Sequence, residues 1–451
     1  MPDVPPLSGR TIGEARLKLI PLGLKLTVDG EGSSAKPKGQ IIEQNPASGT
    51  KLPTGGTVHV RISSGSDDPT LGAPNTIGKL PERGKSVLRI PKLVPAPNEH
   101  FLKAPSGFMV SLEANGLKTP RWLAIAPDGA RFVVESHVER KGVGKSPNRI
   151  SVLYGDQRVV WAEGLNLPFG IGFFKGFLYV ANTDSVVRWP YTVGQMHAEK
   201  PAETVITGIP ERGMRQHWTR NIVFSPGGNR MYLTIGSKEN ADVEEELRGT
   251  IVAYALDFAG RPHGKPKIIT RGMRNPVGLA IHPKTGKLWA VVNERDYLGD
   301  ELVPDFLTEV KEGAHYGWPW YYLGNHRDPR LPVNSALKGK VTVPDMLLPA
   351  HSAPLGLVFG RGGAWGYDAY IALHGSQNRS QFSGYCIMRV PFNEKGRPTG
   401  PPRPFVTGWL ANPKHSNDVY GRPAGLAWAR DGSLIITDDW GGVLWRVTEA
   451  K

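Results

Sequence analysis

Six copies of one short pattern recur along the chain, and this repetition restricts the possible fold more than any other feature of the sequence. Each copy holds a Pro or Asn, a strand of small apolar residues, a turn that contains Gly, and a second apolar strand. The copies lie at residues 120–136, 167–183, 219–237, 274–294, 353–376 and 422–439. Gly permits the left-handed backbone of a tight hairpin, and the intervals leave room for two more strands per copy. The pattern therefore predicts a six-bladed β-propeller over residues 96–451.

The composition favours an all-β globular protein. The 451 residues include 55 Gly and 40 Pro, which alone would fit a disordered chain. They also include 12 Trp, 13 Tyr and 14 Phe, so many short strands joined by tight turns explain the Gly and Pro better. The length suits one large domain with a small one beside it.

Charge and cysteine content exclude several classes of function. The formal charge is +14, but the chain has no block of five or more Lys or Arg and no nucleic-acid-binding motif, so we expect no nucleic-acid partner. Cys386 is the only cysteine, which excludes an internal disulfide and a thiolate metal site. No apolar stretch is long enough for a transmembrane segment, and the opening MPDVPPLSGR lacks the apolar core of a signal peptide.

Residues 1–65 differ in character from the rest of the chain. Apolar residues at helical spacing over 11–24 predict a helix with Thr11 as its N-cap and Glu14 as the capping-box partner. Short β-branched or alternating stretches then predict strands at 25–28, 39–43 and 57–63.

This segment resembles a PASTA domain, a small α+β module. The resemblance depends on the order of Asp3-Val4-Pro5, Gly9, Ala15 and Gly23-Leu24 and on the stretch GQIIEQNPASGTKLPTGGTVHVRISSG. It implies either binding of cell-wall peptidoglycan or a spacer role, outside the cytoplasmic membrane. Residues 66–95, rich in Pro, Gly and charge without a sustained period, are expected to be a linker.

Polar side chains gather at one end of the predicted strands. In a propeller the equivalent ends of all repeats converge on the mouth of the central channel. The second strands of the copies end in Glu135, Asn182, Ser237, the stretch 293–296, His374 and Asp438-Asp439, and the first strands begin beside Arg121, the stretch 217–221, Arg274-Asn275, His351 and Arg422. A purely structural propeller needs no such concentration, so we expect the mouth to bind a ligand or to catalyse a reaction.

Six strings spread over the predicted propeller carry a more specific signal. They are HWTRNIVFSPGG (217–228), RGMRNPVGLAIHP (271–283), VVNERDYLGDELVPDFLTEVKEGAHYGWPWYYLG (291–324), HSAPLGLVFG (351–360), LHGSQNRS (373–380) and GRPAGLAWARDGSLIITDDWGG (421–442). In this order they resemble the sorbosone dehydrogenase branch of the quinoprotein glucose/sorbosone dehydrogenases. The resemblance implies pyrroloquinoline quinone (PQQ) bound with Ca²⁺ over the mouth, and oxidation of an aldose or a sugar aldehyde such as sorbosone. It also implies an external electron acceptor and a periplasmic or extracellular location.

The resemblance assigns roles to several residues. His217 matches the catalytic base, and an imidazole that titrates near neutrality can accept a hydroxyl proton. Arg274 and Asn275 match the Arg-Asn pair that binds cofactor oxygens, for which a guanidinium is well suited. The remaining implied cofactor contacts are Arg220, His351, His374, Arg379 and Arg422. Solvated ion pairs at the rim are the alternative for Arg379 and Arg422. His282, in a hairpin turn, is expected to be exposed.

An acidic loop follows the fourth copy. Glu294, Arg295, Asp296 and Asp300 mark a stretch that offers the hard oxygen ligands Ca²⁺ prefers. In the family several ligands are main-chain carbonyls, so these side chains point to the loop rather than to each ligand. A solvated loop without metal is the alternative.

Two other functions stay open. A propeller without its cofactor would be a non-catalytic binding protein of the cell envelope, although the presence of His217, Arg274-Asn275 and the acidic loop over 293–301 favours the dehydrogenase. A metal-dependent sugar lactonase would need Glu135, Asn182 and Asp438 around one ion on the axis, but the Arg-rich mouth fits an anionic quinone better.

Overall fold

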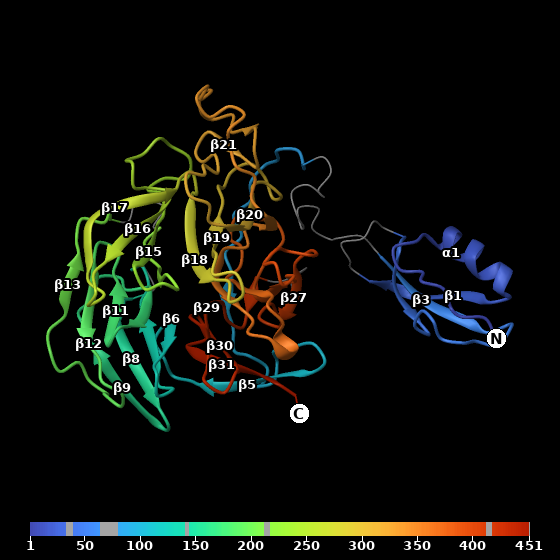
Figure 1. The fold of residues 1–451 in the computed structure, drawn as a ribbon, viewed down its shortest axis with the longest axis horizontal. Coiled ribbons are helices and arrows are strands. Elements are labelled where there is room, and N and C mark those ends of the chain that lie inside the picture. The colour runs from blue at the N-terminus through green and yellow to red at the C-terminus, as the bar shows by residue number, and fades with distance from the viewer. Residues whose placement is uncertain (33–38, 64–79, 140–143, 212–216, 412–416, 451) are drawn as a thin grey trace. The chain divides into compact units, whose positions relative to one another are not determined.

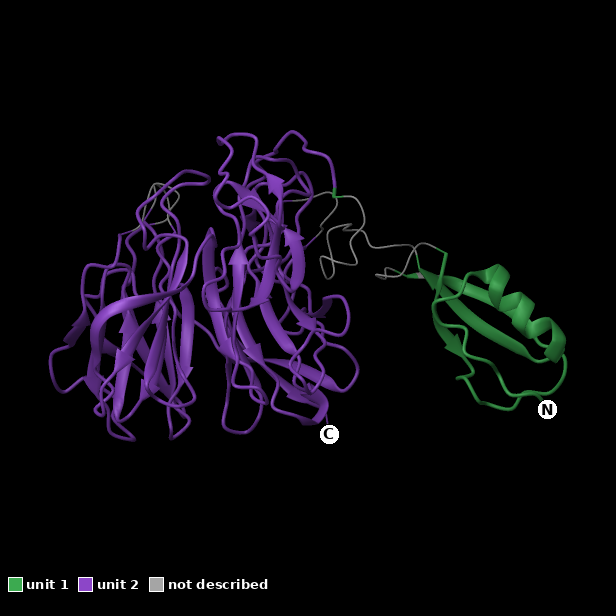
Figure 2. Ribbon diagram, turned by 45° about the horizontal axis from the view of Figure 1, so that its top comes forward, with its two compact units in different colours: residues 1–72, 77–80 green, residues 73–76, 81–451 purple. Residues whose placement is uncertain are grey.

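The computed structural model describes residues 1–32, 39–63, 80–139, 144–211, 217–411 and 417–450, which divide into two compact units (Figure 2). Residues 1–63 and Leu80 belong to the smaller unit, and the described residues from 81 onward form the larger one. Within the described residues, no helix is both long enough and apolar enough to span a membrane.

The smaller unit is one short helix beside a three-stranded sheet. Helix α1 (Ile12–Leu19) begins with the predicted capping box, in which the Thr11 side chain and Glu14 cap each other's backbone N–H groups. It ends before the predicted Leu24 because Pro21 has no N–H to continue the helix, and the chain passes through η1 (Ile20–Leu22) to Gly23 at φ 64°. The sheet has the order β1-β3-β2, with bounds β1 (Lys25–Gly32), β2 (Ile41–Asn45) and β3 (Thr57–Ser63).

The described part of the larger unit contains six four-stranded antiparallel sheets, seen as arrows in Figure 1. The first three sheets are β6 (Pro120–Ile125), β7 (Arg131–Glu135), β8 (Arg149–Tyr154) and β9 (Gln157–Ala162); β10 (Ile171–Phe174), β11 (Phe177–Ala181), β12 (Val186–Pro190) and β13 (Glu203–Ile206); and β14 (Ile222–Phe224), β15 (Arg230–Ile235), β16 (Thr250–Leu256) and β17 (Pro262–Thr270). The next two are β18 (Asn275–Ile281), β19 (Leu288–Asn293), β20 (Pro304–Glu309) and β23 (Met346–Ala350); and β24 (Pro354–Phe359), β25 (Ala369–Leu373), β26 (Cys386–Val390) and β27 (Arg403–Val406).

The last sheet joins the two ends of the larger unit. It consists of β29 (Pro423–Trp428), β30 (Leu434–Asp438), β31 (Val443–Glu449) and β5 (Phe108–Ala114). Strand β31 pairs antiparallel with β5, so the C-terminal strand lies beside the strand that precedes the first copy (Figure 1). Each copy of the sequence pattern forms the first two strands of one sheet.

Adjacent sheets pack closely through their first strands. These strands contact one another in the cyclic order β6, β10, β14, β18, β24, β29 and back to β6. A methyl group on Gly278 of β18 would overlap the carbonyl oxygen of Leu355 in β24, and one on Gly356 would overlap that of Ala424 in β29. The Gly within the first strand of these copies is therefore required by the approach of the neighbouring backbone.

Three small elements complete the larger unit: the pair β21 (Tyr321–Tyr322) and β22 (His326–Arg327), the pair β4 (Lys92–Leu93) and β28 (Asp418–Val419), and the short helix η2 (Gly363–Trp365). Much of the predicted linker is bound here. Gly84 donates its N–H to Leu298, Arg89 donates its own to Gln377, and β4 pairs in parallel with β28. Residues 66–79 lie outside the described residues.

Candidate active site at the strand ends

Polar residues at the starts of the first strands and at the ends of the second strands lie close together. His217 is half-buried there, and its Nδ1 lies 3.1 Å from the carbonyl oxygen of Ser237 and 3.0 Å from the Ser237 hydroxyl. Because that hydroxyl donates to the carbonyl of Glu239, both Ser237 oxygens act as acceptors and Nδ1 carries the proton. Nε2 accepts no hydrogen bond from a described residue, so its lone pair is directed elsewhere.

Burial and the neighbouring charge of Arg274 keep the imidazole of His217 neutral. Burial, followed by the positive charge of Arg274, holds the pKa of His217 well below its ordinary value. A neutral imidazole with its proton fixed on Nδ1 is the form of histidine that acts as a base through Nε2.

Arg220 supports the backbone of this segment. It is fully buried, and its guanidinium donates to the carbonyl oxygens of His217, Thr219 and Pro210 at 2.9, 2.8 and 2.7 Å. These partners are all main-chain carbonyls, so Arg220 holds the backbone around His217 in place. The cofactor contact that the sequence predicts for Arg220 stays a prediction.

Asn275, at the first position of β18, is buried beside His217. Its Oδ1 has no hydrogen-bond partner among the described residues. A methyl group on Gly236 would overlap this Oδ1 and lie 2.9 Å from the Cβ of His217. Gly236 therefore keeps the two side chains together, and Asn275 retains an unsatisfied acceptor at the site.

Arg274 is the centre of a buried ionic cluster. It donates to Oδ2 of Asp296 and to Oδ1 of Asn240, both at 2.9 Å, and to the carbonyl of Glu294 at 2.7 Å. His351 places Nδ1 3.0 Å from Oδ1 of the same Asp296 and Nε2 2.9 Å from the carbonyl oxygen of Gly299. Since both ring nitrogens face acceptors only, His351 is an imidazolium.

The pKa values agree with this assignment. Burial lowers the pKa of His351, but the hydrogen bond and charge of Asp296 outweigh it and raise the value above the ordinary one. Burial raises the pKa of Asp296, and Arg274 and His351 reverse this and hold it well below its ordinary range. Two cations thus share one carboxylate, which leaves the cluster with a net positive charge.

A second cluster gathers around His374. Its Nε2 lies 2.9 Å from Oδ1 of Asp439, which also forms an ion pair with Arg121. Arg422 donates to the carbonyl oxygens of His374 and Gly375 at 2.9 and 2.6 Å. Burial, with the charge of Arg422, lowers the pKa of His374 to about 3, so the ring is neutral and donates from Nε2 to Asp439.

The two clusters meet at the segment that holds His217. The guanidinium of Arg121 lies over the ring of Trp218, 5.7 Å from its centroid, and Arg121 also reaches the second cluster. Asp296 and Arg274 are close enough to influence the pKa of His217. The structure therefore brings His217, Arg274, Asn275, His351, His374 and Arg422 into one region.

The acidic loop is arranged differently from the metal site that its sequence suggests. Arg295, fully buried, donates to Oε2 of Glu294 at 2.9 Å and lies 3.3 Å from Asp328. Asp300 accepts from the backbone N–H of Ser380, and its own carbonyl accepts from Arg379. Arg295 is a cation held by carboxylates, so it does not bind a metal, and Glu294 is oriented toward Arg295.

No group of three His, Cys, Asp or Glu side chains in the described residues is arranged to hold a metal ion. The side chains of the loop from 294 to 301 belong to no such group. Of the residues that a lactonase would need, Glu135 accepts from Arg149 at 2.9 Å and Asp438 accepts from the Trp409 indole at 2.7 Å.

Three residues of the site were not assigned from the sequence. Arg121 and Asp439 lie at the polar strand ends, but the sequence assigns neither of them a role. Asn240 carries no such signal, although its Oδ1 accepts from Arg274 and from the backbone N–H of Asp296. Its place depends on a loop after β15 that folds back on the acidic loop.

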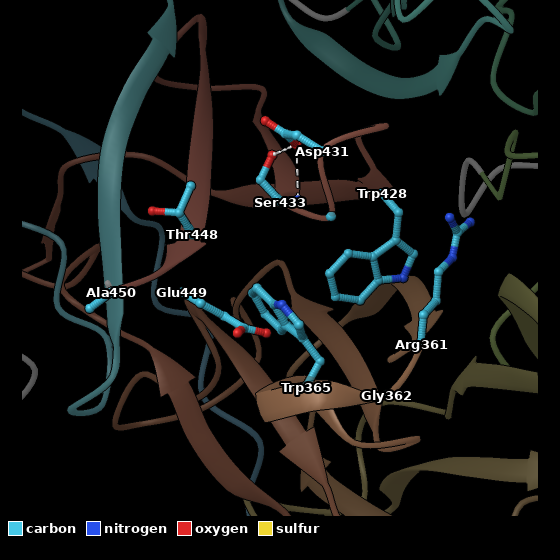
Figure 3. A pocket seen from close by; sticks show the side chains of 10 residues that line it. Arg361, Gly362, Trp365, Trp428, Asp431, Ser433, Thr448, Glu449 and Ala450 are labelled. Atoms are coloured by element: carbon cyan, nitrogen blue, oxygen red, sulfur yellow. Dashed lines mark hydrogen bonds between the residues drawn. The ribbon is translucent and has the colours of Figure 1, made fainter.

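A separate cleft of about 600 Å³ lies at the opposite end of the sheets, between the β24–β25 and β29–β30 turns (Figure 3). Trp365 and Trp428 form its floor, with ring centroids 4.7 Å apart, and Arg361, Asp431 and Glu449 surround them. None of the predicted site residues lines this cleft.

Comparison with known families agrees with both units. Residues 102–309 and 333–450 match the TrAA12-like family, and residues 2–64 match the PASTA domain. The N-terminal prediction of a PASTA domain is thereby confirmed.

Similar proteins point to quinone-dependent oxidoreductases. The chain is 24% identical to a PQQ-dependent pyranose dehydrogenase of Coprinopsis cinerea, over 77% of this chain and 54% of that protein. It is also 24% identical to a PQQ-dependent sugar dehydrogenase of Hypocrea jecorina, over 74% of this chain and 86% of that protein. The holo form of the C. cinerea pyranose dehydrogenase PQQ domain shares the fold, with a TM-score of 0.64 at 21% identity over 80% of this chain and 100% of that one. These relatives do not single out the sorbosone branch.

Proposed function

Because the chain belongs to the TrAA12-like family, we propose that its larger unit is a six-bladed β-propeller that oxidises a sugar with PQQ at the mouth. The observation that carries this proposal is His217, whose Nδ1 donates to Ser237 while Nε2 is left as a neutral base. The cyclic contacts of the first strands and the pairing of β31 with β5 support a closed ring.

The residues at the mouth fit an anionic, oxygen-rich cofactor. Arg121 keeps a buried donor, its Nε, without a partner among the described residues, whereas the unpaired Oδ1 of Asn275 is an acceptor that would take an N–H or O–H of the ligand. The cluster of Arg274, His351 and Asp296 adds net positive charge, which attracts carboxylates. Asn275, Arg121 and Arg274 would therefore hold the cofactor.

The reaction divides between the cofactor and His217. When bound, PQQ supplies a two-electron acceptor. The hydroxyl of the sugar would lie at Nε2 of His217. This nitrogen would take the hydroxyl proton while the C–H hydrogen leaves as a hydride to the two-electron acceptor and a C=O bond forms. Ser237 holds the imidazole in the required tautomer, and Arg220 holds the backbone behind it.

The first experiment is a titration of the purified chain with PQQ, followed by dye reduction with a panel of aldoses that includes sorbosone. We expect stoichiometric binding and sugar-dependent reduction with an external acceptor. A folded protein that does not bind PQQ at tens of micromolar would refute the proposal and leave a non-catalytic binding propeller as the better account.

The pH dependence of the reaction follows from the lowered pKa of His217. A base is active above its pKa, so the acid limb of the rate profile should lie well below pH 6.5. Arg274→Gln removes a positive charge that lowers this pKa, and the limb should then move to higher pH. Profiles of the maximal rate for both proteins check this, and a limb at or above pH 6.5 in the wild-type protein would contradict it.

Gly236→Ala should disturb the site because the added methyl group overlaps Asn275 and crowds His217. We expect dye reduction to fall by about 10–100-fold, the cost of a small misplacement of reacting groups. Gly172→Ala, whose Cβ would meet only Phe224 at 3.5 Å, is the matched control. Equal activities of the two variants would argue against a close-packed site.

For the smaller unit we propose that the PASTA domain binds cell-wall peptidoglycan and that the protein is periplasmic or extracellular. The match to the PASTA domain supports this. Sedimentation with isolated cell walls, compared between the full chain and a chain that begins at residue 81, tests the binding. Detection of the mature protein only in cytosol would contradict the location.

A further inference from the structure

Several oxygens of the loop from 294 to 301 accept hydrogen bonds from cationic side chains of the protein. Three of its main-chain carbonyls are examples: Glu294 accepts from Arg274 at 2.7 Å, Asp296 accepts from Arg330 at 2.8 Å, and Gly299 accepts from His351 at 2.9 Å. The carbonyl of Asp300 accepts from Arg379 at 3.1 Å.

Three of the four carboxylates of the same loop also pair with cations, and the fourth, Asp300, accepts from Ser380. Arg295 binds Glu294, Arg274 and His351 share Asp296, and Arg379 pairs with Glu301. The four side chains Arg274, Arg295, His351 and Arg379 are all less than a tenth exposed, so these contacts are built into the core of the loop.

A calcium ion at this loop would meet the wrong surroundings. Ca²⁺ takes six to eight oxygen ligands, and here the carbonyls of residues 294, 296, 299 and 300 and the carboxylates of Glu294, Asp296 and Glu301 already accept hydrogen bonds or form ion pairs with Arg or His side chains. The ion would also approach several fixed positive charges at short range, which repel it in a poorly solvated interior. Displacing these cations would leave them buried without their partners.

We infer that this chain binds its quinone without calcium at the loop from 294 to 301, because Arg274 and His351 already occupy loop oxygens that the ion would take. This inference rests on the proposed quinone binding. It departs from the Ca²⁺ that the sequence predicts, and its basis is the contacts of the loop oxygens.

The test measures PQQ binding to the full chain by quenching of tryptophan fluorescence, in excess chelator and again in excess CaCl₂. We expect dissociation constants that agree within about twofold, and unchanged melting temperatures of the cofactor-free protein. Binding that requires CaCl₂, or calcium that raises the melting temperature, would overturn the inference while the proposed function stands. Absence of binding in both buffers would refute the proposed function and the inference with it.

His351→Ala provides an independent check, because it exposes Oδ1 of Asp296 and the carbonyl of Gly299. We expect PQQ binding in chelator to weaken by about tenfold and CaCl₂ to restore part of it. His326→Ala, at an exposed position of β22, is the matched control and should bind as the wild-type protein does. If His351→Ala binds PQQ in chelator as tightly as the control does, His351 does not take the place of the calcium ion. If the variant does not fold, the comparison of the two buffers with wild-type protein decides the question.

Discussion

His217→Gln is expected to lower sugar-dependent dye reduction by about 10²–10⁴-fold, the usual contribution of a positioned general base. Glutamine keeps a side chain that can donate to Ser237, but it offers no basic nitrogen where Nε2 lies. The substitution should leave PQQ affinity nearly unchanged, because His217 is neutral and the positive charge of the site comes from Arg274 and His351.

The measurement is the maximal rate with saturating sugar, together with PQQ affinity for each variant. His197→Gln, an exposed position outside the mouth, is the matched control and should retain full activity. A His217→Gln protein that binds PQQ and still turns over at a tenth of the wild-type rate or more would show that another group accepts the proton.

Arg295→Met should be the most destabilising single substitution in the acidic loop. Arg295 has no exposed surface, and it binds Glu294, Asp328 and the carbonyl oxygens of Pro319 and Tyr321. Removing one partner of a buried ion pair leaves the other charge unpaired and costs about 3–5 kcal/mol in the free energy of unfolding.

Denaturant titration or thermal melting would measure this loss. Arg271→Met breaks an exposed pair with Glu246, so it should cost no more than about 1 kcal/mol and serves as the control. If both variants unfold at the same denaturant concentration, the Arg295 cluster contributes specificity of loop conformation rather than stability.

Much of the fold could be predicted because its elements depend on nearby residues. The two strands of each copy form a hairpin whose alternating apolar positions and Gly-containing turn lie within one short segment, and the capping box of α1 spans only Thr11 to Glu14. His217 and the pair Arg274-Asn275 could be named from the resemblance, and the structure brings them to one region of the larger unit.

The roles of charged residues in the acidic loop could not be predicted in the same way. Glu294, Arg295 and Asp296 are adjacent in the sequence, but Arg295 points to Asp328 and Asp296 to His351 and Arg274. Which carboxylate meets a cation depends on loops that come from different sheets. Packing therefore decides which positively charged group meets each carboxylate of this loop.

The burial of His282 is a further feature that depends on residues far away in the sequence. The sequence places His282 in a hairpin turn and so predicts exposure, yet it is fully buried because Phe359 and Phe392 of the next sheet pack against its ring, with centroids 4.8 and 5.7 Å away. By itself the sequence determined the hairpins, the capping box and the polarity of the strand ends, since these depend on local backbone preferences. Only the tertiary structure decided the pairing of β31 with β5, the burial of His282 and the partners of each charge, because contacts between residues far apart in the chain are set by how the sheets pack.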